Sequence, residues 1–228
     1  MLLSHSFSSC EAAIIDLDGP LVDTLGDFEA ALNRMLADLQ LPPVARAFIE
    51  RTVGKGSEHL IRRVLAEQIG RPDGAVDGDL YERAWQAYQA HYHAVNGAFS
   101  EVYPGVREGL QALRAADLPL ACLTNKPLAF AQALLKAKGL DGYFAQVFGG
   151  DSFARKKPDP LPLLKTCEAL GTPPARTLMV GDSQNDALAA RRAGCPVALV
   201  SYGYNHGQPI RAVDADAWID RLDELLLQ

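Results

Sequence analysis

Residues 12–24 read AAIIDLDGPLVDT, in which four apolar residues run into two carboxylates, Asp16 and Asp18, and a glycine. The apolar run is typical of a buried strand in a parallel sheet. Ionised carboxylates are costly to bury unless they are paired or bind a metal. Two carboxylates at the end of a buried strand therefore indicate a cation site, although a D-x-D pattern alone is weak evidence.

Further apolar runs follow this one, and segments with helical patterns lie between most of them. The predicted strands are Ala12–Asp16, Leu118–Thr124, Ala145–Phe148, Thr177–Gly181 and Pro196–Val200, and the predicted helices are Gly105–Ala116, Leu128–Lys138, Leu161–Leu170 and Asn185–Ala193. This alternation predicts an α/β fold with a doubly wound, Rossmann-like parallel sheet, whose functional groups collect at the carboxyl ends of the strands. A last helix is predicted over Asp216–Leu227, with a leucine-rich face packed on the sheet.

The first connection breaks this rhythm, because it is far longer than the dozen or so residues that a crossover needs. It contains helical patterns over Asp27–Leu39, Ser57–Ile69 and Asp79–Ala94. We therefore expect residues 24–96 to form a small helical cap domain. The cap would be inserted into an α/β core made of residues 1–23 and 97–228.

Two of the later runs end in polar residues that suit an anionic ligand. Thr124 and Asn125 supply a hydroxyl and an amide just before a helix, where backbone N–H groups also point at a ligand. Helix capping is the simpler interpretation of these two residues taken alone. In the segment RKKPDP, we expect Arg155 and Lys156 to be solvated and Lys157, which precedes a proline, to point inward.

The run that ends at Gly181 delivers two more carboxylates, Asp182 and Asp186, to the same edge of the sheet. Asp16, Asp18 and Asp182 could then share one cation. An all-oxygen set without His or Cys favours Mg²⁺ over Zn²⁺. Asp186 suits the start of a helix through the macrodipole, and it could also hold Lys157.

Together these groups suit phosphoryl transfer, which depends on positioning and on neutralising charge at the phosphoryl oxygens. The chain has no G-x-x-x-x-G-K-[ST] loop, so hydrolysis of a small phosphate ester fits better than nucleotide chemistry. A net charge of −6 argues against nucleic acid as a partner. The absence of a long apolar span argues against a membrane, and four cysteines without C-x-x-C spacing are expected to be reduced, so we expect a cytoplasmic protein.

The four clusters DLDGPLVDT, LTNK, KPDP and GDSQND resemble, in order, the signature motifs of the haloacid dehalogenase-like phosphatase superfamily. The resemblance implies that Asp16 is the nucleophile and that Asp18 is the acid and base. It also implies that Thr124 and Lys157 hold the phosphoryl group. Mg²⁺ would be bound by the side chains of Asp16 and Asp182 and by the backbone carbonyl of Asp18.

Further segments resemble one branch, the bacterial phosphoglycolate phosphatases: VGKG at 53–56, YPGV at 103–106, GCP at 194–196 and YGYNHG at 202–207. The branch implies 2-phosphoglycolate as substrate. Its carboxylate would need a further cation, for which Lys55 is our candidate, with an exposed loop lysine as the alternative. Pro20 departs from the family, which usually has threonine there, and proline offers neither a hydroxyl nor an N–H.

Several alternatives remain open from the sequence. The enzyme could act on another small sugar or sugar-acid phosphate, or, less in keeping with the motifs, as a phosphomutase; residues of the cap would decide between these. A dehalogenase has no need of Asp18 or a metal, so the intact D-x-D pattern argues against that activity. A phosphoester-binding protein with impaired turnover is favoured only by Pro20, and the sequence leaves open whether the protein is a monomer or a homodimer.

Overall fold

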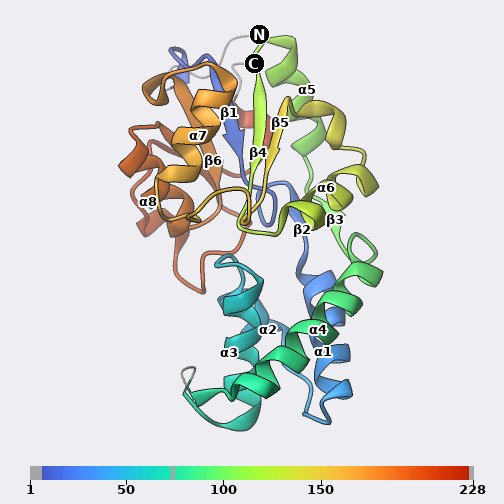
Figure 1. Cartoon of the computed structure of the whole chain (residues 1–228). Helices are drawn as coiled ribbons and strands as arrows, with labels where there is room; N and C mark the ends of the chain where they lie inside the picture. The colour runs from blue at the N-terminus through green and yellow to red at the C-terminus, as the bar shows by residue number, and fades with distance from the viewer. Residues whose placement is uncertain (1–6, 73–74, 226–228) are drawn as a thin grey trace.

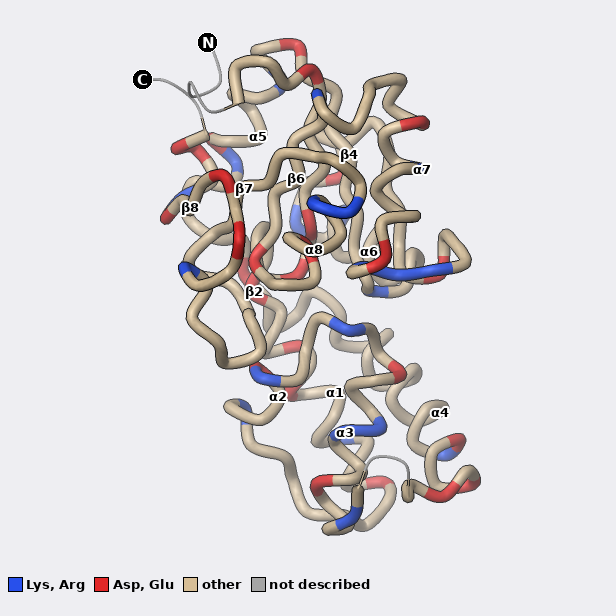
Figure 2. The backbone as a smooth tube through the Cα atoms, turned by 90° about the vertical axis from the view of Figure 1, so that its left-hand side faces the viewer, with Lys and Arg blue, Asp and Glu red and all other residues tan. Residues whose placement is uncertain are grey.

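The computed structural model describes residues 7–72 and 75–225. The chain forms two bodies, an α/β body that holds the sheet and a helical body that holds the helices between residues 25 and 95 (Figure 1). The view from the side shows the same stacking, and it shows Lys and Arg interspersed with Asp and Glu along the chain (Figure 2). No helix in the described ranges is long and apolar enough to cross a membrane.

The α/β body is built on six parallel strands in the order β5-β4-β1-β6-β7-β8. The strands are β1 (Ala12–Ile15), β4 (Leu120–Leu123), β5 (Gln146–Phe148), β6 (Thr177–Gly181), β7 (Val197–Val200) and β8 (Ala217–Ile219). The first strand lies between β4 and β6, so the chain winds outward from it in both directions. This topology confirms the prediction of a doubly wound parallel sheet.

Helices cover both faces of the sheet, since successive side chains of a strand point to opposite sides. Ile15 of β1 belongs to a hydrophobic cluster with α5 and α6, whereas Ile14 belongs to a second cluster with α7 and α8. All four residues of β1 are buried, as expected for a strand covered on both faces. The four helices are α5 (Val106–Ala115), α6 (Leu128–Ala137), α7 (Leu161–Leu170) and α8 (Gln184–Ala193).

The helical body has a hydrophobic core of its own, which includes Leu32, Met35, Leu65 and Tyr88. Its helices are α1 (Leu25–Asp38), α2 (Arg46–Thr52), α3 (Ser57–Ile69) and α4 (Gly78–Val95). The chain enters and leaves this body through an antiparallel pair of short strands, β2 (Val22–Asp23) and β3 (Glu101–Val102).

Asp27 ties the two connections between the bodies together. Its carboxylate is fully buried and accepts hydrogen bonds from the backbone N–H groups of Gly97 and Phe99, both at 2.7 Å. Gly26 beside it has no room for a side chain, because a Cβ would lie 2.2 Å from the carbonyl oxygen of Phe99. The entry and exit of the helical body are therefore held side by side.

The prediction of a C-terminal helix over Asp216–Leu227 was wrong. Ala217–Ile219 instead forms β8, which pairs with β7 at the edge of the sheet, and Leu222–Leu225 forms a 3₁₀ turn (η6). Leu222 and Leu225 are fully buried beside α5, so the apolar spacing arises from one tight turn rather than from a long helix. Residues 226–227 of the predicted helix lie outside the described residues.

Candidate active site

The carboxyl ends of β1, β4 and β6, with the segment that follows β5, deliver the predicted residues to one edge of the sheet, which faces the helical body (Figure 1). A cavity lies there, between the two bodies. From the α/β body it is lined by Asp16, Asp18, Thr124, Asn125, Lys126, Asp182, Ser183 and Tyr204, and from the helical body by Phe28, Val53, Gly54, Gly56, Ser57, Leu60 and Tyr92.

Asp16 and Lys157 form the centre of the site. Lys157 Nζ lies 2.9 Å from Asp16 Oδ2, and its side chain is only 2% exposed. Burial raises the pKa of Asp16 to about 7, while the Lys157 ammonium opposes that shift. Burial alone would lower the pKa of Lys157, but the charges of Asp16 and Asp186 outweigh it, so its pKa lies above the ordinary value and it stays an ammonium.

Asp186 holds Lys157 in place. Its Oδ1 accepts a 2.7 Å hydrogen bond from Lys157 Nζ, which also donates to the backbone carbonyl of Leu123 at 2.8 Å. Its Oδ2 accepts from the Ser183 hydroxyl and backbone N–H, as the acidic partner in a capping box at the start of α8. Both oxygens of this fully buried carboxylate are thus engaged by the protein.

Asp16, Asp182 and Asp186 each offer a carboxylate oxygen, and these atoms lie within 4.8 Å of one another. Because Asp16 and Asp182 line the cavity and Asp186 does not, Asp16 and Asp182 are the better placed to hold a cation. Burial and then the charges of Asp186 and Asp16 raise the pKa of Asp182 well above its ordinary value. A pair of carboxylates whose ionised forms are disfavoured by their surroundings fits a hard divalent cation.

Two glycines form the cradle in which Asp182 lies. A Cβ on Gly19 would lie 1.7 Å from Asp182 Oδ2, and a Cβ on Gly203 would lie 2.3 Å from Asp182 Cβ. Gly19 also has φ +100°, a backbone conformation that strongly favours glycine. Tyr204 completes the cradle, because its backbone N–H donates to Asp182 Oδ2 at 2.6 Å.

Thr124 and Asn125 lie where the sequence predicts them, but the amide of Asn125 is engaged by the backbone. Asn125 Nδ2 donates to the carbonyl oxygens of Gly54 and Lys157, both at 2.9 Å, and Oδ1 accepts from the backbone N–H of Lys157 at 3.1 Å. Asn125 therefore joins the helical body to the segment that carries Lys157. The Thr124 hydroxyl lines the cavity and accepts from the backbone N–H of Lys126 at 3.2 Å.

Lys126 is a cation of the cavity that we did not single out from the sequence. Its Nζ lies 2.6 Å from Asp18 Oδ1, and its side chain is 2% exposed. The ammonium also lies over two aromatic rings of the helical body, 4.5 Å from the centroid of Phe28 and 5.1 Å from that of Tyr92. The only signal in the sequence was its place directly after Thr124-Asn125, which a surface lysine would share.

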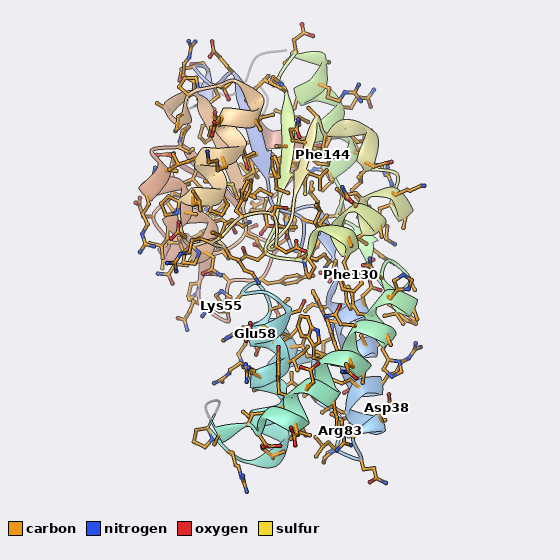
Figure 3. The ribbon with its side chains drawn as sticks, in the orientation of Figure 1. Asp38, Lys55, Glu58, Arg83, Phe130 and Phe144 are labelled. Atoms are coloured by element: carbon orange, nitrogen blue, oxygen red, sulfur yellow. The ribbon has the colours of Figure 1, made fainter. Side chains whose placement is uncertain are left out.

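Lys55, our candidate from the sequence for binding a carboxylate, is exposed and does not line this cavity. It lies on the loop before α3, near Glu58, at the end of the helical body that faces the α/β body (Figure 3). Its neighbours Gly54 and Gly56 do line the cavity, and both have positive φ, +107° and +90°. The loop thus approaches the site through its backbone while the lysine side chain stays outside the cavity.

Pro20 fits the turn after Asp18 without a backbone donor. The N–H groups of Gly19 and Leu21 bond to Val22 and Leu17, and Pro20 itself accepts a 2.9 Å hydrogen bond from the Tyr202 hydroxyl at its carbonyl. The turn is therefore closed by its other residues. The missing N–H costs this loop none of these hydrogen bonds.

Tyr204 is a second residue that sequence reasoning missed as an individual contributor. Its hydroxyl accepts from the backbone N–H of Thr24 at 3.0 Å and donates to Asp23, so it reaches the point where the chain enters the helical body. It also packs in the hydrophobic core of that body. One side chain thus connects the Asp182 cradle with the connection between the bodies.

Comparison with known proteins places this geometry in a family. A family model for haloacid dehalogenase-like hydrolases matches residues 10–194. A phosphoglycolate phosphatase of Thiobacillus denitrificans is 44% identical over 95% of this chain and 94% of its own length, and one of Nitrosospira multiformis is 46% identical over 94% and 93%. The crystal structure of a predicted phosphoglycolate phosphatase from Haemophilus somnus matches with a TM-score of 0.90 at 33% identity, over 95% of this chain and 96% of that one. The resemblance seen in the four motifs is confirmed.

Proposed function

This chain belongs to the haloacid dehalogenase-like hydrolases, and from that premise we propose that it hydrolyses a small phosphate monoester, 2-phosphoglycolate, to glycolate and phosphate. The substrate is proposed because relatives that match nearly the whole chain at 44% and 46% identity are named phosphoglycolate phosphatases. The four motifs and the segments of the branch support the same assignment.

One observation carries the proposal: the Asp16 carboxylate lines a cavity and is held 2.9 Å from the buried ammonium of Lys157, with Asp18 beside it on the same turn. A carboxylate so placed can act as a nucleophile towards phosphorus and carry the phosphoryl group as an aspartyl-phosphate. Lys157, whose ammonium lies against Asp16, and Thr124, which lines the cavity, would bind phosphoryl oxygens.

The proposed reaction has two steps. An oxygen of Asp16 attacks phosphorus, the bond from phosphorus to the ester oxygen breaks, and Asp18 gives its proton to the departing glycolate oxygen. Asp18 then takes a proton from water, whose oxygen attacks phosphorus and displaces the Asp16 carboxylate as phosphate forms. Asp18 thus serves as acid and then as base, which returns both residues to their starting state.

The donor set fits Mg²⁺ as the cofactor. The side chains of Asp16 and Asp182 and the backbone carbonyl of Asp18 would hold it, all through oxygen. Bound Mg²⁺ would neutralise charge on the phosphoryl oxygens. Gly19 and Gly203 would keep Asp182 in place for this role, and Asp186 would keep the Lys157 ammonium beside Asp16, where the phosphoryl group is proposed to bind.

The test compares kcat/KM of the purified chain across 2-phosphoglycolate, hexose phosphates and nucleotides, with Mg²⁺ and with a chelator. We expect 2-phosphoglycolate to be among the best substrates and phosphate release to require the metal. Asp16→Asn should abolish turnover, because an amide is a poor nucleophile, whereas Asp141→Asn on an exposed turn should behave as wild type. Wild-type rates in Asp16→Asn would exclude the covalent route, and a marked preference for another ester would exclude 2-phosphoglycolate.

A further inference from the structure

Lys126 is bonded less completely than the other buried lysine of the site. An ammonium has three hydrogen-bond donors. Lys157 Nζ contacts three oxygens, those of Asp16, Asp186 and the Leu123 carbonyl. Within residues 7–72 and 75–225, one oxygen accepts from Lys126 Nζ, that of Asp18, and aromatic ring faces lie over the ammonium.

A second residue that lines the same cavity carries an unpartnered hydroxyl. Tyr92 is 1% exposed and lines the cavity, and its hydroxyl has no hydrogen-bond partner among the described residues. A buried polar group without a partner is costly, so such a group in a cavity indicates a ligand that would satisfy it. Lys126 and Tyr92 thus both line the cavity and both carry donors that the protein leaves unused, which points to an anionic, oxygen-bearing ligand.

We propose that Lys126 binds the carboxylate of the leaving group and so makes the enzyme specific for short acidic phosphate esters. This inference rests on the proposed function, because it takes Asp18 as the group that protonates the ester oxygen. In 2-phosphoglycolate a single methylene separates that oxygen from the carboxylate carbon. The carboxylate must therefore lie close to Asp18, and Lys126 Nζ is 2.6 Å from Asp18 Oδ1.

The surroundings of Lys126 strengthen this recognition. Phe28 and Tyr92 exclude water from the ammonium, and its attraction for a carboxylate is greater in a water-poor site than in bulk solvent. Because both rings come from the helical body, the carboxylate site is complete only when the two bodies are together as in this structure.

The other lysines near the site are less suited to the carboxylate. Lys157 is already held between Asp16 and Asp186. Lys55 is exposed and lies outside the cavity. Among the described residues, Lys126 is the lysine that lines the cavity, and it is therefore available for a second negative group once the phosphoryl group is bound.

The test measures kcat/KM for 2-phosphoglycolate and for 2-hydroxyethyl phosphate, which replaces the carboxylate with a neutral hydroxymethyl group. Lys126→Met should lower the ratio of kcat/KM for 2-phosphoglycolate to kcat/KM for 2-hydroxyethyl phosphate by about 10- to 100-fold, the loss expected for a hydrogen bond to a charged group. The loss should be seen mainly with the acidic ester, and Lys126→Arg should recover part of it. Lys136→Met, which removes an exposed charge from α6, should leave the ratio unchanged.

An equal loss on both esters in Lys126→Met would overturn the inference, because it would show that Lys126 acts only through Asp18 or through the fold. Tyr92→Phe gives a second measurement that does not depend on the folding of Lys126→Met: the ratio should fall in this variant too, and an unchanged ratio would overturn the inference that the carboxylate binds between Lys126 and Tyr92. The proposed function fails separately, if the wild-type enzyme prefers a different ester. The role of Lys126 is then judged from the ratio for any acidic ester that is hydrolysed and its neutral analogue.

Discussion

Replacing Asn125 with alanine should weaken both the stability and the activity of the enzyme. The side chain makes three hydrogen bonds to backbone groups, at 2.9, 2.9 and 3.1 Å, and it is 6% exposed. At about 1 kcal/mol each, their loss should lower the free energy of unfolding by about 3 kcal/mol. Because two of the bonds fix the backbone of Lys157, a small shift of its ammonium should also lower kcat by about 10- to 100-fold.

Urea denaturation measures the first effect and steady-state kinetics the second. Asn33→Ala is the matched control, since Asn33 also accepts a 2.8 Å hydrogen bond from a backbone N–H, that of Val44, but lies in the helical body away from the cavity. It should lose stability and keep kcat. If Asn125→Ala loses less than about 1 kcal/mol and keeps wild-type kcat, the amide does not position Lys157 and the reasoning is refuted.

Two further predictions concern the cradle and the edge of the sheet. Gly19→Ala should lower apparent Mg²⁺ affinity and activity by about 100-fold, because its Cβ would displace Asp182; an unchanged Mg²⁺ titration of activity would contradict this. Partial burial raises the pKa of Asp216, but hydrogen bonds from Arg191 and from the Val197 N–H outweigh it, so the pKa lies below its ordinary value. The ionised form of Asp216 therefore stabilises the folded state above the unfolded pKa of about 4, and this stabilisation is lost as the pH falls through the folded pKa. Asp216→Asn should lower the free energy of unfolding by about 1 kcal/mol at pH 7, a small value because the side chain is partly exposed, and by less in acid. Denaturant unfolding at neutral and at acid pH measures both values.

The sequence alone predicted the strands and helices that have a clear pattern of apolar residues along the chain. The runs that became β1, β4 and β6 are fully buried, and Leu161–Leu170 and Ser57–Ile69 were predicted with the bounds that the structure has. The α2 helix and the two-residue strands β2 and β3 were missed, because elements this short carry little periodicity. The prediction of a helix in the C-terminal segment was wrong, because pairing with β7 outweighed a helix-like apolar pattern.

For the site, the sequence predicted which groups meet at the edge of the sheet but not how each is engaged. Lys157 could be chosen over Lys156 from its place before a proline, and the structure puts it 2.9 Å from Asp16. Lys126 and Lys55 could not be told apart in this way. Their difference depends on Phe28 and Tyr92, which come from two helices of the inserted body and form no pattern with Lys126 along the chain.

The charges of the site explain why a metal would be needed before the ester can bind. Asp16, Asp18, Asp182 and Asp186 supply four carboxylates, whereas Lys126 and Lys157 supply two ammonium groups. With Asp18 protonated, as the first step of the proposed reaction requires, the remaining carboxylates exceed the ammonium groups by one charge, which a divalent cation would more than balance. Without the cation, burial favours protons on Asp16 and Asp182, and a protonated Asp16 is a poor nucleophile. Mg²⁺ would therefore replace those protons as well as attract the ester, so nucleophile activation and substrate binding would depend on the same ion.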